Sequence, residues 1–408
     1  MRELSYPKSK INVLLLEKVD KIAFDLFKEE GYNVESLDGS LNKKDLIKKI
    51  KDVSILGIRS KTIISNKVIK SANKLLAIGA FCIGTNQIKF ESCNDSGIVV
   101  FNAPYSNTRS VVEIVIAQII NLMRKIIIKS NKMHSGVWRK DSLDSFEIRN
   151  KVIGIVGYGN IGSQLSVICE ALGMKVLYYD IVDKLSIGNA KKCKSLNDLL
   201  QNSDIVSLHV DGKKSNTNLI SDKEFSIMKE KSILVNYSRG NVVDINSLIK
   251  NIKSKKIMGA ALDVFPEEPS NNTEKFKSKV KGIEEIILSP HIGGSTKEAQ
   301  KNIGSYVPDK IIDFINSGNT SSSVNFPKLS LPEQSDSHRL IHIHKNQPGV
   351  MLKINKIISE YNINIKGQYL KTNEEIGYVI TDIDSVYNKE VVKSLKNIPA
   401  TIKLRVLY

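Results

Sequence analysis

The stretch that most constrains the fold is "KVIGIVGYGNIG", residues 151–162 of a chain of 408 residues. An apolar run comes first, glycines stand at positions 157, 159 and 162, and a helix-like pattern follows. Gly157 permits a tight turn, Gly159 lets the backbone approach a ligand, and Gly162 lets the helix pack closely against the strand. This succession of strand, glycine turn and helix predicts a βαβ unit of a parallel sheet.

The same turn predicts a site for a dinucleotide cofactor. The free N–H groups and partial positive charge of the helix N-terminus suit a pyrophosphate. The next apolar run, "KVLYYD", ends at Asp180, where a carboxylate can hold both hydroxyls of a ribose. Because its charge repels a 2′-phosphate, NAD is favoured over NADP, although Lys184 nearby leaves the use of both cofactors open. A glycine-rich turn in a fold that binds no nucleotide is the alternative.

Further apolar runs extend this pattern into three sheets. Before residue 107, short strands alternate with amphipathic segments, and after residue 151 the pattern restarts as a second parallel sheet. A segment rich in Ser, Asn and Pro follows, and residues 338–408 have the order βαββαβ of the ferredoxin-like plan. We therefore predict an α/β protein with two Rossmann-like, doubly wound parallel-sheet domains and a C-terminal ferredoxin-like domain.

A long helix is predicted to follow the second sheet. Ser295 and Glu298 have the spacing of a capping box, and the pattern continues to about Ser317. Pro308 lies inside this helix and lacks the backbone N–H that the helix needs. A proline in a helix interior costs about 3 kcal/mol, so we expect a kink or a break there.

Composition excludes several classes of protein. No apolar run approaches the ~20 residues that span a bilayer. The four cysteines are scattered without a CxxC pair, so a soluble protein of a reducing cytoplasm with no metal site is expected. The formal net charge is +17, but the lysines are spread along the chain and no nucleic-acid recognition motif accompanies them. We therefore expect neither a membrane nor a nucleic acid as partner.

Three polar residues stand just past predicted strand ends, where open α/β sheets bind their ligands. His291, in "LSPHIGGST", suits proton transfer because its ordinary pKa lies near neutrality. A carboxylate at Glu268 would favour the imidazolium, although this reasoning alone does not choose between Glu268 and its neighbour Glu267. Arg239 can clamp a substrate carboxylate and polarise the adjacent oxygen. The three together predict oxidation of a 2-hydroxy acid.

The motifs "GYGNIG", "NYSRGNVVD", "GAALDVFPEEP" and "SPHIGGST" resemble, in order and spacing, the signatures of the D-isomer-specific 2-hydroxyacid dehydrogenases. "IRSKT", "IGAFCIGTNQI" and "NAPYSNTRSVVE" extend the resemblance upstream, and the tail "IHIHKNQPGV" resembles an ACT regulatory domain. Tyr237 departs from the family, which usually has a small residue there, and Pro308 interrupts a helix that the family keeps continuous.

The resemblance assigns roles to individual residues. It implies a catalytic set of Arg239, Glu268 and His291, with the second glutamate of "PEEP" chosen. The implied cofactor site comprises Gly157, Gly159, Asn160, Ile161, Gly162, Asp180, Tyr237, Ser238, Arg239, Asp263, His291, Ile292, Gly293 and Gly294. The implied substrate residues are Arg59, Ser60, Asn107 and Lys140, and the implied serine-binding residues, at an interface between two ACT domains, are His344, Asn346 and Asn364.

The resemblance also implies an activity and a domain plan. With the ACT-like tail, it extends to family members that oxidise 3-phospho-D-glycerate to 3-phosphohydroxypyruvate with NAD, the first step of L-serine biosynthesis. Such members are homotetramers inhibited by L-serine, and some also reduce 2-oxoglutarate. The implied domains are a substrate-binding domain of residues 1–106 and 296–326, an NAD-binding domain of 107–295, a linker of 327–337 and an ACT domain of 338–408. A dehydrogenase for another 2-hydroxy acid and a non-catalytic, NAD-sensing binding protein are the alternatives.

Overall fold

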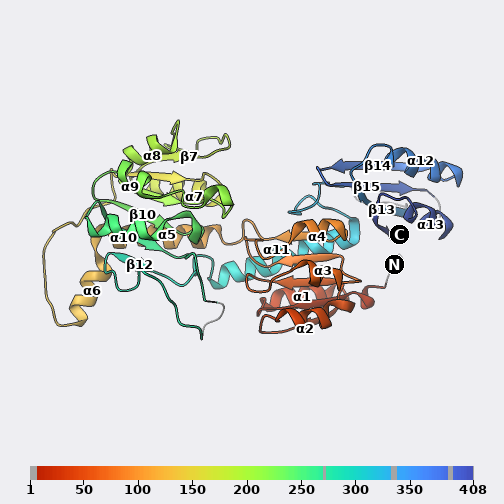
Figure 1. Ribbon diagram of the computed structural model, residues 1–408, viewed down its shortest axis with the longest axis horizontal. Coiled ribbons are helices and arrows are strands. Elements are labelled where there is room, and N and C mark those ends of the chain that lie inside the picture. Colours follow the sequence, from red (N-terminus) through yellow and green to blue (C-terminus); the bar gives the residue numbers. More distant parts are fainter. Residues whose placement is uncertain (1–6, 270–272, 332–337, 385–388, 408) are drawn as a thin grey trace. The chain divides into compact units, whose positions relative to one another are not determined.

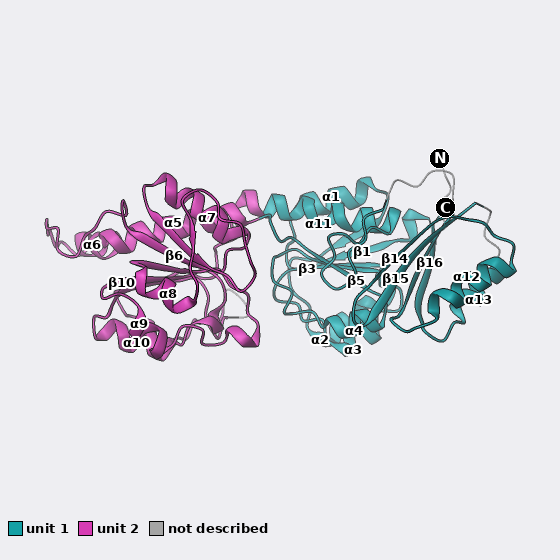
Figure 2. Cartoon of the chain, turned by 90° about the horizontal axis from the view of Figure 1, so that it is seen from above, with its two compact units in different colours: residues 1–106, 300–408 teal, residues 107–299 magenta. Residues whose placement is uncertain are grey.

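The computed structural model describes residues 7–269, 273–331, 338–384 and 389–407 (Figure 1). The chain forms two compact units: unit 1 has residues 1–106 and 300–408, and unit 2 has residues 107–299 (Figure 2). Over the described residues, each unit has a parallel sheet, and unit 1 has an antiparallel sheet as well. The predicted fold class is therefore confirmed. No helix in these ranges is long and apolar enough to cross a membrane.

The sheet of unit 2 is built around the strand that leads into the glycine turn, β6 (Val152–Val156). The strand order is β12-β11-β10-β9-β6-β7-β8, so the chain reverses its direction across the sheet between β6 and β9. Such a switch point is where open α/β sheets bind ligands. The other strands are β7 (Lys175–Tyr179), β8 (Lys191–Lys192), β9 (Ile205–Leu208), β10 (Ser232–Asn236), β11 (Ile257–Leu262) and β12 (Ile286–Leu288).

Helices cover both faces of this sheet because its strands are apolar on both sides. One face packs against α5 (Thr108–Arg124) and α7 (Asn160–Ala171). The other packs against α8 (Leu196–Asn202), α9 (Asp222–Ile227) and α10 (Ile245–Lys253).

The helical segment that follows residue 107 is divided in two. Lys125 has a left-handed φ of 53°, which ends α5 and starts α6 (Ile126–His134). A left-handed residue cannot continue a right-handed helix. α6 buries none of its residues and extends outward from unit 2 (Figure 2). The later helix α11 (Lys297–Ser317) belongs mostly to unit 1. We call residues 126–147 the arm.

The parallel sheet of unit 1 has the order β2-β1-β3-β4-β5. α1 (Lys21–Glu29) and α11 cover one face, and α2 (Lys43–Lys49), α3 (Asn66–Lys70) and α4 (Phe90–Asp95) cover the other. The strands are β1 (Asn12–Leu15), β2 (Asn33–Ser36), β3 (Ile55–Ile58), β4 (Ala77–Ala80) and β5 (Val99–Asn102).

α11 differs from its prediction at two points. Its N-terminus is capped by Thr296, whose Oγ1 accepts the N–H of Ala299 at 3.1 Å, so Ser295 is not the cap. The helix also continues through Pro308 to Ser317, so the predicted break is wrong. The missing N–H removes only one hydrogen bond. Val307 and Ile311, on either side of Pro308, are fully buried against the sheet and hold the helix together.

The C-terminal sheet has the order β14-β15-β13-β16, which is that of the predicted ferredoxin-like plan. One face packs against α12 (Val350–Glu360) and α13 (Lys389–Lys396). The other face joins the apolar core of the first sheet. The strands are β13 (His338–Lys345), β14 (Ile365–Thr372), β15 (Ile376–Ile383) and β16 (Thr401–Leu407).

Two arginine side chains of this sheet form hydrogen bonds with the rest of unit 1. Arg339 is fully buried and binds Asp382 through two hydrogen bonds of 2.7 Å, while its Nη1 donates to the carbonyl of Ser317 at 2.9 Å. Arg405 donates to the carbonyl of Ile315 at 3.1 Å. Both cations therefore meet the negative C-terminal end of α11.

The predicted linker of residues 327–337 lies outside the described residues from position 332 onward. Before that point the chain is packed. Leu329 is buried, and the buried Asn325 accepts the N–H of Val100 at 2.8 Å and donates to the carbonyl of Ile98 at 2.9 Å. These hydrogen bonds explain why a polar segment can lie against the sheet.

The buried ion pair leads to the first prediction. Replacing Asp382 with asparagine leaves the Arg339 charge buried without its partner. We expect the free energy of unfolding to fall by about 3–5 kcal/mol, measured by urea denaturation. The matched control is Glu147→Gln, which breaks an exposed pair with Arg149 and should change stability by about 1 kcal/mol or less. Equal effects of the two substitutions would contradict the prediction.

Candidate active site

The glycine turn has the geometry that a pyrophosphate needs. Gly157 has a φ of +92°, and a Cβ there would lie 2.5 Å from the carbonyl oxygen of His209. A Cβ on Gly162 would lie 2.2 Å from the carbonyl oxygen of Gly157, so only glycine lets α7 start this close to the strand. Nothing lies within 4 Å of a Cβ on Gly159, which caps α7 next to Asn160 and Ile161. The turn thus has no space for a side chain at Gly157 or Gly162, and it has open space for a ligand at Gly159.

Asp180 follows β7 and is held beside this turn. Its Oδ2 accepts the N–H of Tyr158 at 2.8 Å and its Oδ1 accepts the N–H of Val182 at 2.9 Å. Each carboxylate oxygen has a second lone pair for a ribose hydroxyl. The next side chains, Ile181 and Val182, are 88% and 55% exposed and offer apolar surface to a flat base.

A buried asparagine shapes the turn that presents Arg239. Oδ1 of Asn236 accepts the N–H of Ser238 at 3.1 Å, and its Nδ2 donates to the carbonyl of Arg239 at 3.0 Å. A Cβ on Gly240 would lie 2.0 Å from the backbone of Phe265, so this turn also packs directly against the chain that leads to Glu268. Sequence reasoning missed both residues, although "NYSRG" contains them.

His291 and Glu268 are brought together at the carboxyl ends of β12 and β11. Nδ1 of His291 lies 2.7 Å from Oε2 of Glu268, and Oε1 of Glu268 accepts the N–H of Phe265 at 3.1 Å. Glu267, the open alternative, is exposed. The pairing through Nδ1 leaves Nε2 of His291 to exchange a proton with a bound substrate.

Electrostatics favour the charged form of both partners. The hydrogen bond that His291 donates to Glu268 raises the pKa of His291 against its partial burial, and the charges of Glu268 and Asp263 add to this effect. Partial burial works to raise the pKa of Glu268, but hydrogen bonding and charge from His291 outweigh it and lower that pKa. The positive charge of Arg239 lowers the pKa of both groups, which places its guanidinium within electrostatic range of the pair.

The structure also shows the surroundings of the remaining residues of unit 2 that are predicted to bind the cofactor. Asp263, 1% exposed, accepts the N–H groups of Ile292 and Gly293 at 2.9 and 2.8 Å. A Cβ on Gly294 would lie 2.2 Å from Nδ2 of Asn107, so Gly294 lets the loop pass this side chain. Tyr237 and Ser238 are buried at the end of β10.

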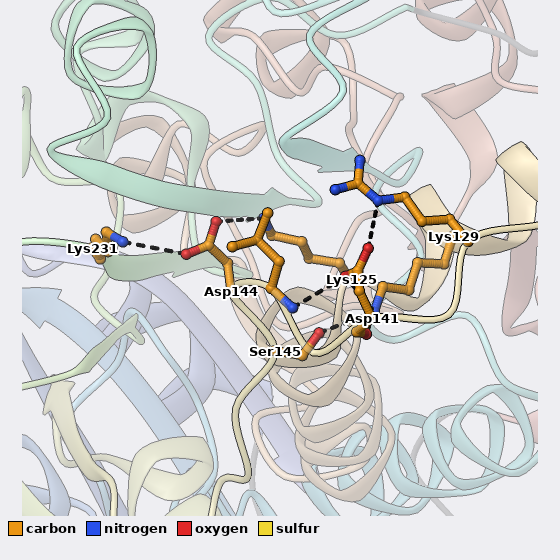
Figure 3. Close-up of polar contacts among 8 residues, drawn as sticks. Lys125, Lys129, Asp141, Asp144, Ser145 and Lys231 are labelled. Atoms are coloured by element: carbon orange, nitrogen blue, oxygen red, sulfur yellow. Dashed lines mark hydrogen bonds and ion pairs between the residues drawn. The ribbon is translucent and has the colours of Figure 1, made fainter.

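Lys140 lies apart from this cluster, in the arm. Figure 3 shows how the arm is tied down: Asp144 pairs with Lys125 and Lys231 at 3.1 and 3.2 Å. The backbone carbonyl of Asp141, the neighbour of Lys140, accepts Nζ of Lys129 at 2.9 Å. Lys140 lines a pocket formed by arm residues alone, among them Lys129, Met133 and Trp138, and neither His291 nor Glu268 lines it. The structure does not bring Lys140 to the His291–Glu268 pair within one chain.

The predicted substrate residues Arg59 and Ser60 follow β3 in unit 1. Their loop is held by Glu17, 7% exposed, whose carboxylate accepts the N–H groups of Lys61 and Thr62 at 2.9 and 2.7 Å. Nothing in the sequence around Glu17 signals this role, because the contact spans more than forty residues.

The predicted effector residues are separated within one chain. His344 pairs with Gly377 in the β13–β15 ladder, whereas Ile365, next to Asn364, pairs with Ile383 at the other end of β15. His344 is buried, with Nδ1 hydrogen-bonded to the carbonyl of Lys345 at 2.7 Å. Asn346 donates to the carbonyl of Asn373 at 2.7 Å. Among the described residues no group of three or more His, Cys, Asp or Glu side chains is arranged to hold a metal ion.

Comparisons with known proteins identify the family of the chain. Residues 116–293 match the model of the D-isomer specific 2-hydroxyacid dehydrogenase NAD binding domain, and residues 340–403 match that of the AHAS small subunit-like ACT domain. The chain is 48% identical to D-3-phosphoglycerate dehydrogenase of Dictyostelium discoideum, over 99% of both chains. It is 47% identical to the Escherichia coli K12 protein of that name, over 100% of both chains.

A solved structure shows the same fold over most of the chain. The D-lactate dehydrogenase with NAD+ from Lactobacillus jensenii superposes with a TM-score of 0.64 and 28% identity, covering 76% of this chain and 97% of its own. Full-length identity near one half, together with both domain matches, goes beyond likeness of fold. The chain therefore belongs to the D-isomer specific 2-hydroxyacid dehydrogenase family of NAD-dependent oxidoreductases, in its group of D-3-phosphoglycerate dehydrogenases with a C-terminal ACT domain.

Proposed function

We propose that this enzyme oxidises 3-phospho-D-glycerate to 3-phosphohydroxypyruvate with NAD, in the first step of L-serine biosynthesis. The observation that carries the proposal is the His291–Glu268 pair beside Arg239, at the strand ends of a domain whose glycine turn fits a dinucleotide. The name shared by the full-length relatives supports this choice of substrate. Reduction of 2-oxoglutarate is a second activity of the same residues.

His291, Glu268 and Arg239 of unit 2 each have a separate role in the reaction. NAD, when bound, accepts the hydride that leaves C2 of the substrate. Nε2 of His291 takes the proton of the C2 hydroxyl, and Glu268 stabilises the imidazolium that forms. Arg239 binds the carboxylate and polarises the C2 oxygen. In the reverse direction the His291 imidazolium returns the proton, so Glu268 keeps the acid available by raising the pKa of His291.

The cofactor residues of the family are present with suitable surroundings. The open space at Gly159 and the N-terminus of α7 suit the pyrophosphate, and the two oxygens of Asp180 suit the ribose hydroxyls. Asp180 favours NAD because its charge repels a 2′-phosphate. Arg59, Ser60, Asn107 and Lys140 remain our predictions for the phosphate and carboxylate of the substrate.

The domain plan follows from these roles. We propose that residues 1–106 and 296–326 form the substrate-binding domain, 107–295 the NAD-binding domain, 327–337 the linker and 338–408 the ACT regulatory domain.

We further propose that L-serine inhibits the enzyme at a site built by two ACT domains. The ladder register supports this, because His344 and Asn346 lie at one end of the sheet and Asn364 at the other. A second copy in antiparallel orientation would bring Asn364 to the first two. The effector is a small zwitterion, for which amide and imidazole groups are suitable hydrogen-bond partners.

Self-association is part of the proposal, with a homotetramer as the expected assembly. The arm supports it: Trp138, Leu143 and Met133 are 78%, 62% and 50% exposed. Large apolar side chains that cluster on one surface mark protein interaction sites. Lys140 lies in the same segment, so it reaches a substrate only if a second copy brings the arm against its active site.

An activity assay tests the proposed function. We expect purified protein to oxidise NADH when phosphohydroxypyruvate is added, followed by absorbance, and L-serine to lower the rate. No turnover of this substrate, with turnover of another 2-oxo acid, would favour the alternative of a different 2-hydroxyacid dehydrogenase. Turnover that serine leaves unchanged would contradict the regulatory part alone.

A further inference from the structure

A chain of buried hydroxyl groups lies behind the His291 loop. The hydroxyl of Tyr237 lies 3.0 Å from Oγ of Ser289, and Ser289 donates to Oδ1 of Asp263 at 2.5 Å. The three residues are 6%, 8% and 1% exposed. Because Ser289 donates to Asp263, its lone pairs are left to accept from Tyr237, and the direction of both hydroxyl groups is determined.

Asp263 in turn holds the His291 loop by hydrogen bonds. Its Oδ1 also accepts the N–H of Ile292 at 2.9 Å, and its Oδ2 accepts the N–H of Gly293 at 2.8 Å. These are the two peptide groups that follow His291. One carboxylate therefore holds consecutive N–H groups of the loop, and Ser289 and Tyr237 hold the carboxylate.

His291 needs this support because its backbone is unusual. Its φ of +54° lies in the left-handed region, which residues with a Cβ rarely adopt. Pro290 precedes it, and the N–H of His291 donates to the carbonyl of Ser289 at 3.0 Å. Such a conformation persists only where the surroundings impose it. In this conformation Nδ1 meets Glu268 at 2.7 Å.

We propose that Ser289 is a positioning residue for the reaction: through Asp263 it holds the left-handed turn that presents His291 to Glu268 and to the substrate, and Tyr237 supports it from behind. Ser289 touches none of the catalytic residues with its side chain. Tyr237 contributes its hydroxyl as the hydrogen-bond partner of Ser289, and this is the role we propose for a large residue beside the cofactor loop. The inference rests on the proposed function only for its kinetic assay.

Losing the Ser289 hydroxyl has a defined consequence. Asp263 loses one donor, and the buried Tyr237 hydroxyl loses the Ser289 oxygen and keeps only Gln118 of its two side-chain partners, which is costly. The loop then relaxes, and the hydrogen bond that His291 donates to Glu268 weakens. The charged groups that act on His291 are Glu268, Asp263 and Arg239. Since Glu268 provides the largest effect, the pKa of His291 falls toward its ordinary value.

The test compares Ser289→Ala with Ser232→Ala. Ser232 is equally buried, on β10 of the same sheet, but its hydroxyl donates to the carbonyl of Lys229 at 2.7 Å, at the end of the strand away from the site. For Ser289→Ala we expect kcat to fall on the order of 10–100-fold at pH 8 with little change in KM for NADH. The alkaline limb of the pH profile for reduction should move to lower pH. Ser289→Thr, which keeps the hydroxyl, should recover most of the rate, and Ser232→Ala should behave like the unchanged enzyme.

A second measurement is independent of turnover. NMR titration of histidine-labelled protein, with His291 assigned from the spectrum of His291→Asn, gives the pKa of His291 directly. A lower pKa in Ser289→Ala but not in Ser232→Ala supports the proposal even if phosphohydroxypyruvate is not the substrate. An unchanged pKa together with an unchanged pH profile overturns it. So does a loss of rate that matches only the fraction of unfolded protein, measured by circular dichroism.

Discussion

Replacing His291 with asparagine is expected to lower kcat by roughly 10²–10⁴-fold, the usual contribution of a general acid–base catalyst. The amide can still contact Glu268, but it cannot take or return a proton near neutral pH. The Gly157–Gly162 turn and Asp180 are untouched, so the affinity for NADH should stay within a few-fold. Steady-state kinetics with phosphohydroxypyruvate and fluorescence titration with NADH measure the two effects separately.

The prediction is specific because kcat should fall while the affinity for NADH should change little. The substitution would remove a positive charge and a ring from the cofactor loop, so some change in KM is tolerable. Asparagine also accepts the left-handed φ of +54° more readily than most residues, so the loop should keep its shape. Turnover within about tenfold of the unchanged enzyme would remove His291 from the proton transfer.

Replacing Glu268 with glutamine is expected to shift the pH profile as well as to slow the reaction. The Glu268 carboxylate raises the pKa of His291. Reduction needs the imidazolium, so its rate is full below the pKa of His291 and is lost as the pH rises through it. Without the carboxylate that pKa falls, so the alkaline limb of the reduction profile moves to lower pH. For oxidation, which needs the neutral ring, the acid limb moves in the same direction.

Glu267→Gln is the matched control for this prediction. Glu267 is the neighbouring glutamate, carries the same charge and is exposed. It makes no hydrogen bond with His291, whose Nδ1 is bound to Glu268. We expect its pH profile to coincide with that of the unchanged enzyme. A shift of similar size in both variants would mean that general charge near the loop, rather than the 2.7 Å contact, sets the pKa of His291.

Some local details could not be predicted because they depend on competition between neighbours. Ser295 and Thr296 are both suitable caps for α11. Only the path of the loop places Thr296 so that its Oγ1 accepts the N–H of Ala299. The apolar pattern from residue 108 to 134 is continuous enough for one helix, yet a left-handed Lys125 divides it. Pro308 is tolerated because buried residues on both sides of it pack α11 against the sheet. Helix propensity describes single residues and does not include this tertiary packing.

The sequence by itself predicted the parallel sheets and the glycine turn, which the structure has. It also proposed the set of His291, Glu268 and Arg239, with Glu268 chosen over Glu267 by the family resemblance. Strand periodicity and turn chemistry are local properties, and the carboxyl ends of parallel strands meet at one edge whatever else the chain does. Only the tertiary structure decided that Ser289, Asp263 and Tyr237 stand behind the His291 loop and that Asn236 shapes the Arg239 turn. The Tyr237–Ser289 and Ser289–Asp263 contacts join residues 52 and 26 positions apart, a separation that carries no pattern, because a buried hydroxyl finds its partner by packing.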